Sequence, residues 1–460
     1  MARGAARPRR RDIAPIGWEG DAPPVPAAVG GAALLEGETD GFAVDFTYPT
    51  DASRVATKFS SVVMSYGLDT FFTNTGTSPK QVFDASGALV WSPHNMFLNS
   101  AAPVTQTVTT VVGQNYTVTV TGSGSMAGTS GASGTATAGS PRTYTATGTS
   151  SIWTVTGTLT QIQMNRGAVA TAYLPTTGTI RNGIAVDYDP ATHVSKGFCL
   201  EGAATNSLLN NATLSTQNVA VGAAVYVLSF LGTGTIALSG VSTAGPLVGT
   251  GASNRVYLLF TPTAGTLTLT VTGTVSNAQL EQSVTGGTPT SIIPTYAASA
   301  TRATDAVSFP LSTIPALGSE YSIYTRFSAI AGTLVSSRSV FNLHDGTSTE
   351  MTAVLASVNA VRFRVTDGNV IQADLTTVGS LVANVMQSVA GRVKAADFAA
   401  SIGGAAVLTD VAGTLPTLTT VTFGTAGGPS GTIGTFNIEK IVIVTSRGWS
   451  NAELVTKAST

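Results

Sequence analysis

A long internal repeat constrains the fold of this chain more than any other feature of its sequence. The stretch "VTGTLTQIQMNRGAVATAYLPTTG", from Val155 to Gly178, returns as "VTGTVSNAQLEQSVTGGTPTSIIPTYAAS", from Val271 to Ser299. Both stretches open on Val-Thr-Gly-Thr, pass a Gln followed by a large apolar residue, and end on an aliphatic residue, Pro and Thr. Upstream, residues 95–125 match residues 206–235, so each unit spans about 85–95 residues, too long for a short-period solenoid. The repeat therefore predicts two domains of one type.

Within each unit the apolar residues recur at every second position. Tyr116, Val118 and Val120 alternate with threonines, and Leu267 and Leu269 do the same in the second unit. A period of two indicates β-strands with one buried face. Only 10% of the residues are charged, against about 25% in ordinary soluble domains, and the Gly- and Thr-rich turns follow at short intervals. Each unit is therefore predicted to be an antiparallel β-sandwich.

The charged residues return after about residue 302, and the last region contains five strand-like runs separated by turns. Asp367-Gly368 lies between two alternating runs and predicts a β-hairpin. Ser450 and Glu453 have the spacing of a capping box, which predicts a short helix at the end of the chain. We therefore expect a third sandwich that is completed by a terminal helix.

Together these patterns predict an all-β protein with two tandem jelly-roll-like β-sandwiches, a third sandwich and an extended N-terminal arm. The expected divisions are an arm over residues 1–45, an extended or β connecting segment over 46–94, the first repeat over 95–182, a linker with the second repeat over 183–305, and the last sandwich over 306–460.

The N-terminal arm is basic and rich in proline. Arg7, Arg9, Arg10 and Arg11 stand together before a segment without helix or strand periodicity. A solvated tail and a peptide that docks on an acidic groove of a larger assembly both fit this composition. Nucleic-acid contact is disfavoured, because the basic run is isolated from aromatic residues and the net charge is −1.

Catalytic and metal-binding patterns are not found in the sequence. The single cysteine, Cys199, excludes an intrachain disulfide, and the three histidines have no metal-ligand spacing. Asp189-Pro190 is predicted to open a turn. Asp345, Asp367, Asp374 and Asp397 are likewise predicted to be turn residues, with calcium ligation as the alternative. We expect no enzyme activity, no cofactor and no membrane-spanning segment.

Two arginines stand out because they are single charges in otherwise uncharged sandwiches. Arg142 is the only charged residue between Ala101 and Thr160, and Arg255 is the only one between Gly202 and Leu280. Aligning "PRTYTATG" with "NRVYLLFTP" makes them equivalent, either as structural anchors or as contacts to a neighbouring subunit or sugar acid. The candidate glycan contacts, chosen as aromatic or polar side chains on loops and strands, are Trp91, Tyr324, Arg362 and Arg364. Trp153 and Trp449 are predicted to be core residues.

Two parts of the chain resemble known phage proteins. The last region, with "FNLHDGT", "VRFRVTDGN" and "IEKIVIVTSRGWSNAEL", resembles jelly rolls of the concanavalin A/laminin-G type. The preceding region, with "VDYDPATHVSKGFCLEGAATNSLLNN" and "SIIPTYAASATRATD", resembles head spike fibre proteins and some tail fibres of phages. The resemblance covers residues 95–460, and the N-terminal arm lies outside it.

The resemblance implies a structural spike or fibre on the outer surface of a phage particle, made in the host cytoplasm. Its expected partners are other virion proteins through the arm, further copies of itself, with a trimer favoured, and host surface polysaccharide through the last jelly roll. The alternatives are a tail fibre or receptor-binding protein and a carbohydrate-binding adhesin outside a virion. No partner among nucleic acids or membranes is expected.

Overall fold

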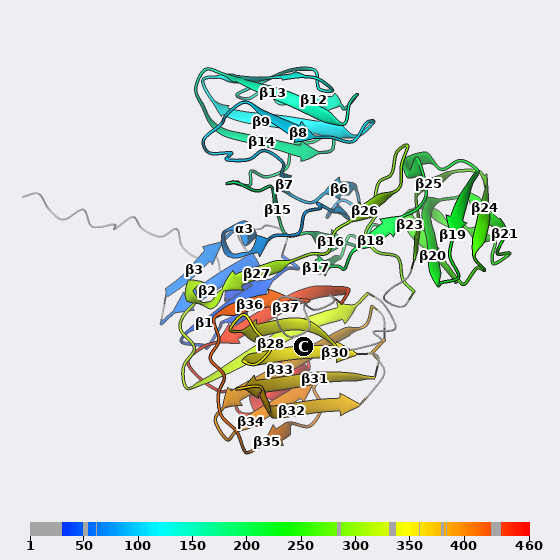
Figure 1. Ribbon diagram of the computed structural model, residues 1–460. Helices are drawn as coiled ribbons and strands as arrows, with labels where there is room; N and C mark the ends of the chain where they lie inside the picture. Colours follow the sequence, from blue (N-terminus) through cyan, green and yellow to red (C-terminus); the bar gives the residue numbers. More distant parts are fainter. Residues whose placement is uncertain are drawn as a thin grey trace, which may run out of the picture.

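The computed structural model describes residues 30–48, 54–60, 62–282, 287–330, 337–357, 359–378, 381–382, 384–424 and 434–460. A central sandwich of two large sheets forms the lower part of the molecule in Figure 1. Its sheet A contains, in spatial order, β3 (Val62–Tyr66), β2 (Val55–Phe59), β1 (Gly41–Asp45), β37 (Phe436–Val444), β28 (Glu320–Ala329), β33 (Met386–Lys394), β34 (Phe398–Ile402) and β35 (Leu408–Asp410), and β17 (Ser195–Leu200) with β16 (Val186–Tyr188) extends it beside β37.

The second layer, sheet B, packs its apolar face against sheet A. Its strands, again in spatial order, are β32 (Val370–Val378), β31 (Ala360–Asp367), β30 (Met351–Ser357), β29 (Arg338–His344), β36 (Thr420–Phe423), β27 (Val307–Pro310), β4 (Thr73–Asn74), β15 (Arg181–Asn182) and β7 (His94–Asn95). Phenylalanines from both sheets fill the interface, including Phe42, Phe327 and Phe363, which are fully buried. The alternation that the sequence predicted for the last region is thus the core face of a sandwich.

Several short elements complete the central sandwich. They are α1 (Gly31–Leu34), α3 (Leu68–Phe71), η2 (Leu311–Thr313), α4 (Asn451–Ala458) and a separate hairpin of β5 (Gln81–Phe83) with β6 (Leu89–Trp91). Helix α4 begins at the predicted capping box, in which the Ser450 hydroxyl accepts from the Glu453 amide. The predicted hairpin is also confirmed: β31 pairs with β32 around a turn at Gly368 and Asn369, both with positive φ.

The expected N-terminal arm ends earlier than the sequence suggested. Strand β1 lies in the middle of sheet A, because it pairs with β2 on one side and with β37 on the other. Phe42 and Val44 of this strand are fully buried in the central core. Residues 31–45 are therefore part of the last sandwich, and so is much of the expected connecting segment over 46–94. The reason is that strand pairing in this sandwich joins the two ends of the described chain, which sequence order does not reveal.

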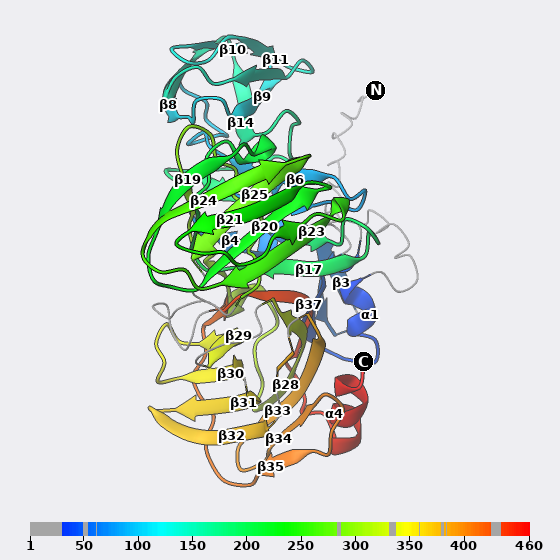
Figure 2. The same cartoon turned by 90° about the vertical axis from the view of Figure 1, so that its right-hand side faces the viewer.

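A buried carboxylate fastens this N-terminal segment to the C-terminal helix. Glu38 accepts hydrogen bonds from Arg447 at 2.8 Å and from the Trp449 indole at 2.9 Å. Trp449 is fully buried, and the Lys457 ammonium lies 5.0 Å from the centre of its ring. The prediction that Trp449 packs in the core is confirmed, and Figure 2 shows α1 beside α4. Both ends of the described chain thus stabilise the same sandwich.

The two predicted repeats are β-sandwiches inserted into the central sandwich. The first insert comprises β8 (Gln106–Thr109), β9 (Asn115–Gly122), β10 (Ser125–Thr129), β11 (Gly134–Thr137), β12 (Arg142–Thr145), β13 (Ser150–Thr156) and β14 (Leu159–Arg166). The second comprises η1 (Asn211–Thr213), β19 (Gln217–Val221), β20 (Tyr226–Gly232), β21 (Thr235–Gly240), β22 (Leu247–Val248), β23 (Gly251–Phe260), β24 (Gly265–Thr272) and β25 (Val275–Gln282).

Both inserts have the same topology. A four-stranded sheet with the order β11-β10-β13-β8 faces a three-stranded sheet with the order β12-β9-β14, and the second insert repeats this as β22-β21-β24-β19 and β23-β20-β25. Each insert starts and finishes on paired strands: β7 with β15 for the first, β18 (Ala204–Asn206) with β26 (Ala300–Arg302) for the second. We call each of these strand pairs the stem of its insert. The inserts form separate lobes above the central sandwich (Figure 1). The expected all-β fold class is confirmed.

The repeated sequence motif has a structural cause at the foot of each insert. Buried Asn95 donates to the carbonyls of Ile162 and Leu174 and accepts from two backbone amides. Asn206 makes the same four bonds in the second insert, with Ala278 and Ile293 as its carbonyl partners.

The repeated Gln holds the chain that leaves each insert. The side-chain oxygen of Gln163 accepts from the amide of Leu174, and that of Gln279 accepts from the amide of Ile293. Both residues are buried, so these bonds satisfy groups that would otherwise be costly to bury. The shared Gln and aliphatic-Pro-Thr ending is therefore a hydrogen-bonded foot that anchors each sandwich.

Candidate functional site

A polar cleft lies where the second insert meets the central sandwich. Its floor is the outer face of sheet A at β17 and β37, because Ile438 and Leu200 point into the core while Asn437 and Cys199 point outward. The β5–β6 hairpin and the residues after β25 form the walls, and β23 forms the roof. We call this space of about 280 Å³ the junction cleft. It is lined among others by Gln81, Asp187, Arg255, Tyr257, Asn384 and Asn437.

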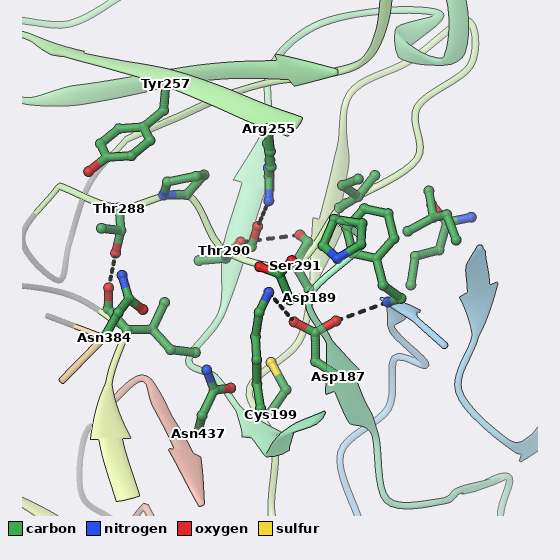
Figure 3. Close-up of a pocket in the computed structure, with 18 of the residues that line it drawn as sticks. Asp187, Asp189, Cys199, Arg255, Tyr257, Thr288, Thr290, Ser291, Asn384 and Asn437 are labelled. Atoms are coloured by element: carbon green, nitrogen blue, oxygen red, sulfur yellow. Dashed lines mark hydrogen bonds and ion pairs between the residues drawn. The ribbon is translucent and has the colours of Figure 1, made fainter. Parts of the chain in front are cut away.

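The roof of the junction cleft is set by alternation along β23. Val256, Leu258 and Phe260 pack on the core of the second insert. Arg255 and Tyr257 therefore point to the opposite side, and Tyr257 is 51% exposed. Figure 3 shows Arg255 directed toward Thr290 and Asn437 rising from the floor. An aromatic ring and several amide side chains thus surround one space.

Arg255 is held by its own insert. Its guanidinium donates to the Ser229 hydroxyl at 2.9 Å and to the Thr290 carbonyl at 2.5 Å. Burial lowers the pKa of Arg255, and the nearby carboxylate of Glu281 opposes this effect. The Glu281 carboxylate accepts from the amide and the hydroxyl of Thr290. Arg255 is therefore positioned before any ligand arrives.

The carboxylates that line the cleft among the described residues are already engaged. Asp187 accepts from the Phe83 amide at 2.9 Å and pairs with Lys196 at 3.2 Å. Burial raises the pKa of Asp187, while Lys196 opposes the shift. Asp189 accepts from the amides of Ala191 and Thr192, which confirms its predicted role as a turn opener. The third carboxylate, Glu201, belongs to the ion cluster described next.

A buried ion cluster closes the base of the second insert. Lys80, Glu201, Arg302 and Asp305 are each at most 3% exposed. Lys80 pairs with Asp305 and lies 3.6 Å from Glu201, and Arg302 pairs with Glu201. Burial alone raises the pKa of Glu201, but the charges of Arg302 and Lys80 overcome it and hold the pKa at about 2. Two cations and two anions balance each other, as buried charges must.

Three polar atoms of the junction cleft have no hydrogen-bond partner among the described residues. They are the side-chain oxygens of Gln81 and Asn437 and Nε of Arg255. Asn437 is only 5% exposed, and a buried polar atom that remains unpaired costs about 1–3 kcal/mol. Such atoms mark positions where a bound molecule or ordered water completes the hydrogen bonding.

The predicted equivalence of Arg142 and Arg255 is wrong. Arg142 pairs with Val118 in the register of β12 with β9, whereas the same position in the second insert, opposite Leu228, is occupied by Leu258. Among the described residues, Arg142 donates to the carbonyl and the hydroxyl of Ser133 in its own insert. The sequence alignment was misled because β23 begins several residues earlier than its counterpart β12. Arg255 and Tyr257 lie in that extension, so they are additions of the second insert.

Tyr324 is excluded as a glycan contact in this structure. It is 3% exposed, and it packs with Trp449 and Leu454 under helix α4. The expectation that strand residues of this region lie on an open face fails here, because α4 covers that part of sheet A.

The remaining candidate residues lie outside the junction cleft. Trp91 stacks against Arg166, whose guanidinium carbon lies 5.3 Å from the centre of the indole ring. Arg362 and Arg364 lie on sheet B and share the carboxylate of Asp374, at 3.6 and 2.6 Å. Arg7, Arg9, Arg10 and Arg11 fall outside the described residues, so their predicted docking role stays a prediction. Arg255 is thus the candidate that the structure places in the junction cleft, together with residues that sequence reasoning did not select.

Sequence reasoning missed Gln81, Asn437 and the ion cluster. A signal existed for the cluster, since Lys80, Glu201 and Asp305 are isolated charges that flank uncharged segments. No comparable signal marks Gln81 or Asn437, because their significance comes from which face of a strand they occupy. They become recognisable only when distant strands are brought together.

The described residues contain no group of three or more His, Cys, Asp or Glu side chains arranged to hold a metal ion. Among the predicted turn aspartates, Asp345 accepts from Thr347 and Asp397 pairs with Arg392. His94 is buried, donates from Nδ1 to the Ser92 carbonyl and accepts the Arg166 amide at Nε2. Within the same described ranges, no helix has the length and apolar character needed to cross a bilayer.

Comparison with known proteins gives only distant structural similarity. No family model and no curated protein sequence matches the chain. The Ruminococcus gnavus IT-sialidase CBM40 bound to α2,3-sialyllactose is 17% identical, covering 32% of this chain and 84% of that one, with a TM-score of 0.27. The NanB sialidase from Streptococcus pneumoniae is 13% identical over 32% of this chain and 26% of that one, with a TM-score of 0.28.

A third similar structure is the binding domain of botulinum neurotoxin DC in complex with SialylT. It is 13% identical, covers 33% of this chain and 38% of that one, and has a TM-score of 0.27.

Proposed function

We propose that this chain is a non-enzymatic spike or fibre protein on the outer surface of a phage particle, where it recognises glycans of the host surface. The observation that carries the proposal is the duplicated insert: two sandwiches of one topology stand on the central sandwich as separate lobes (Figure 1). Their few charges and hydrogen-bonded feet suit rigid structural units. The resemblance of residues 186–211 and 291–305 to phage head spike fibre proteins points to the same role.

The proposal assigns binding, without catalysis, to the chain. Asp187 is paired with Lys196, Asp189 caps a turn, and Glu201 is locked between two cations. Hydrolysis of a glycosidic bond uses two carboxyl groups that face each other across the substrate. In the junction cleft the carboxylates instead support the walls, and the amide and aromatic groups are left to contact a ligand.

The partners under this proposal are other virion proteins at the N-terminal arm and further copies of the chain, with a trimer favoured. Immunogold labelling of intact particles with an antibody to the first insert tests the virion assignment. We expect label on the outside of the particle, and its position distinguishes a head spike from a tail fibre. If particles from cells that express the protein carry no label, the virion assignment is wrong, and a carbohydrate-binding adhesin outside the virion is the remaining alternative.

A deletion that tests docking through the N-terminal arm has to spare the residues that belong to the central sandwich. Removing residues 1–45 would delete β1 from the middle of sheet A and remove Glu38, so loss of incorporation would only report unfolding. Removing residues 1–29 leaves both in place. We expect this shorter deletion to fold, with an unchanged melting temperature, and to be missing from particles. Replacing Arg7, Arg9, Arg10 and Arg11 by serine is the matched variant, and normal incorporation of both variants would refute docking through the arm.

A further inference from the structure

We infer that the junction cleft is the glycan-binding site and that it takes a neutral, hydroxyl-rich sugar at the end of a saccharide chain. This inference rests on the proposed recognition of glycans and names its site and ligand class. This site lies at the junction between the central sandwich and the second insert, outside the parts that the two inserts share.

The unpaired atoms of the cleft determine the ligand chemistry. The side-chain oxygens of Gln81 and Asn437 need a donor, and Nε of Arg255 needs an acceptor. A sugar hydroxyl both donates and accepts, so a neutral sugar can pair with all three once these buried atoms turn toward the ligand. A phosphate or carboxylate group only accepts, and it would leave the two amide oxygens unpaired. The free hydrogen-bonding groups therefore favour hydroxyls over an anion.

The charges around the cleft agree with a neutral ligand. Lys196 is paired with Asp187, and Arg255 already donates to Ser229 and Thr290 with Glu281 nearby. Cations that are already compensated offer little attraction to an anion. The walls thus offer directional hydrogen bonds to a ligand and little electrostatic attraction to a charged one.

Tyr257 supplies the apolar contact that sugars use. Tyr257 is 51% exposed at the roof of the cleft, and it comes from the extension of β23 that the first insert lacks. An amphipathic aromatic ring packs on the C–H face of a pyranose while hydroxyls at the ring edge reach polar groups. A volume of about 280 Å³ lies near the lower end of the roughly 300–1,000 Å³ typical of small-molecule sites, which suits a terminal sugar.

The test uses the full-length protein on a glycan array that pairs neutral hexose-terminated oligosaccharides with the same chains ending in sialic or uronic acid. We expect binding to the neutral series. Tyr257→Ala should weaken it about 10- to 100-fold, as for an aromatic residue at the centre of a contact. Asn437→Leu should weaken it about 5- to 10-fold, as for one lost hydrogen bond.

Leu259→Ala is the matched control. Leu259 is 49% exposed on the same strand and lies outside the lining of the cleft, so binding should be unchanged. Thermal unfolding of each variant verifies that it folds. If Asn437→Leu does not fold, Tyr257→Ala still tests the site, because Tyr257 lies at the surface. Competition with purified capsular polysaccharide or lipopolysaccharide then identifies the source of the sugar.

Each outcome separates this inference from the proposed function. Wild-type protein that binds no glycan refutes glycan recognition itself. Wild-type binding that Tyr257→Ala leaves unchanged overturns the junction cleft and keeps glycan recognition. A preference for the acid-terminated series overturns the neutral ligand class, and loss of binding in Leu259→Ala to the same extent as in Tyr257→Ala shows that the effect is not specific to the cleft.

Discussion

The two inserts share a scaffold and differ where they meet the rest of the molecule. Asn95 and Asn206 make the same four hydrogen bonds at the foot of their sandwiches, and Gly122 and Gly232 both have positive φ where the backbone of the neighbouring strand leaves no room for a Cβ atom. Among the described residues, the second insert alone has an ion cluster at its base and a long strand, β23, over a cleft. The duplicated parts thus maintain the fold, and the distinguishing parts lie at the junction with the central sandwich.

The largest difference between the inserts is expected from Arg302→Met. Arg302 pairs with Glu201 in the buried ion cluster, and its loss leaves a buried carboxylate undercompensated. Breaking such a pair typically costs about 3–5 kcal/mol. Hydrogen exchange measured by mass spectrometry should show a loss of this size in the opening free energy of β18 and β26.

Arg181→Met is the matched change in the first insert. Arg181 also lies on the last strand of its stem, but its described contacts there are hydrogen bonds to the backbone carbonyls of Asp69 and Phe72. Its loss should cost about 1–2 kcal/mol, as for lost hydrogen bonds. Equal effects of the two arginines would show that the ion cluster does not distinguish the stems.

The two feet differ in how many bonds depend on the shared asparagine. Asn95→Ala leaves two carbonyls and two amides without a side-chain partner. Asn206→Ala leaves two amides unpaired, whereas the carbonyls of Ala278 and Ile293 keep their bonds from the Asn211 side chain. We expect Asn95→Ala to lower the opening free energy of the first insert by about 2–4 kcal/mol and Asn206→Ala to lower that of the second by about 1–3 kcal/mol, because unpaired buried groups retain their desolvation cost. Hydrogen exchange resolves the inserts separately, and equal losses would show that the Asn211 bonds give no compensation.

The fold was predictable from sequence wherever structure is local or duplicated. The period of two around Tyr116 and the capping box at Ser450 reflect short-range rules, and the repeat identified both inserts. The place of β1 between β2 and β37 was not predictable, because pairing between the ends of the chain leaves no local pattern. The cleft was missed for the same reason: Asn437 looks like any polar residue on a strand until β17 and the second insert are placed beside it.

A histidine-dependent pH effect should distinguish the first insert from the second. His94 is buried in its stem, and burial lowers its pKa to about 3, whereas Thr205 occupies the equivalent position in the second stem. The folded-state pKa lies below the unfolded value of 6.5. The neutral form therefore contributes stability fully above pH 6.5, and this contribution is lost as the pH falls toward 3.

Between pH 7 and pH 4.5 the first insert should lose about 2–3 kcal/mol of opening free energy from this histidine, at roughly 1.4 kcal/mol for each pH unit below 6.5. Hydrogen exchange corrected for intrinsic rates measures the loss. His94→Gln is the control, since it removes the titrating group, and a pH dependence that remains in this variant would assign the effect to carboxylates.

The smallest effects concern the two arginines that the sequence made look equivalent. Arg142 donates to Ser133 on the surface of its insert, so Arg142→Ala should change stability by less than about 0.5 kcal/mol. Arg255→Ala removes hydrogen bonds to Ser229 and Thr290 and leaves Glu281 with less compensation, so we expect a loss of about 1–2 kcal/mol. Thermal unfolding and hydrogen exchange of both variants measure the difference. If Arg142→Ala were as destabilising as Arg255→Ala, the two arginines would share a structural role despite their different strand registers. The extension of β23 would then not explain why the two inserts differ.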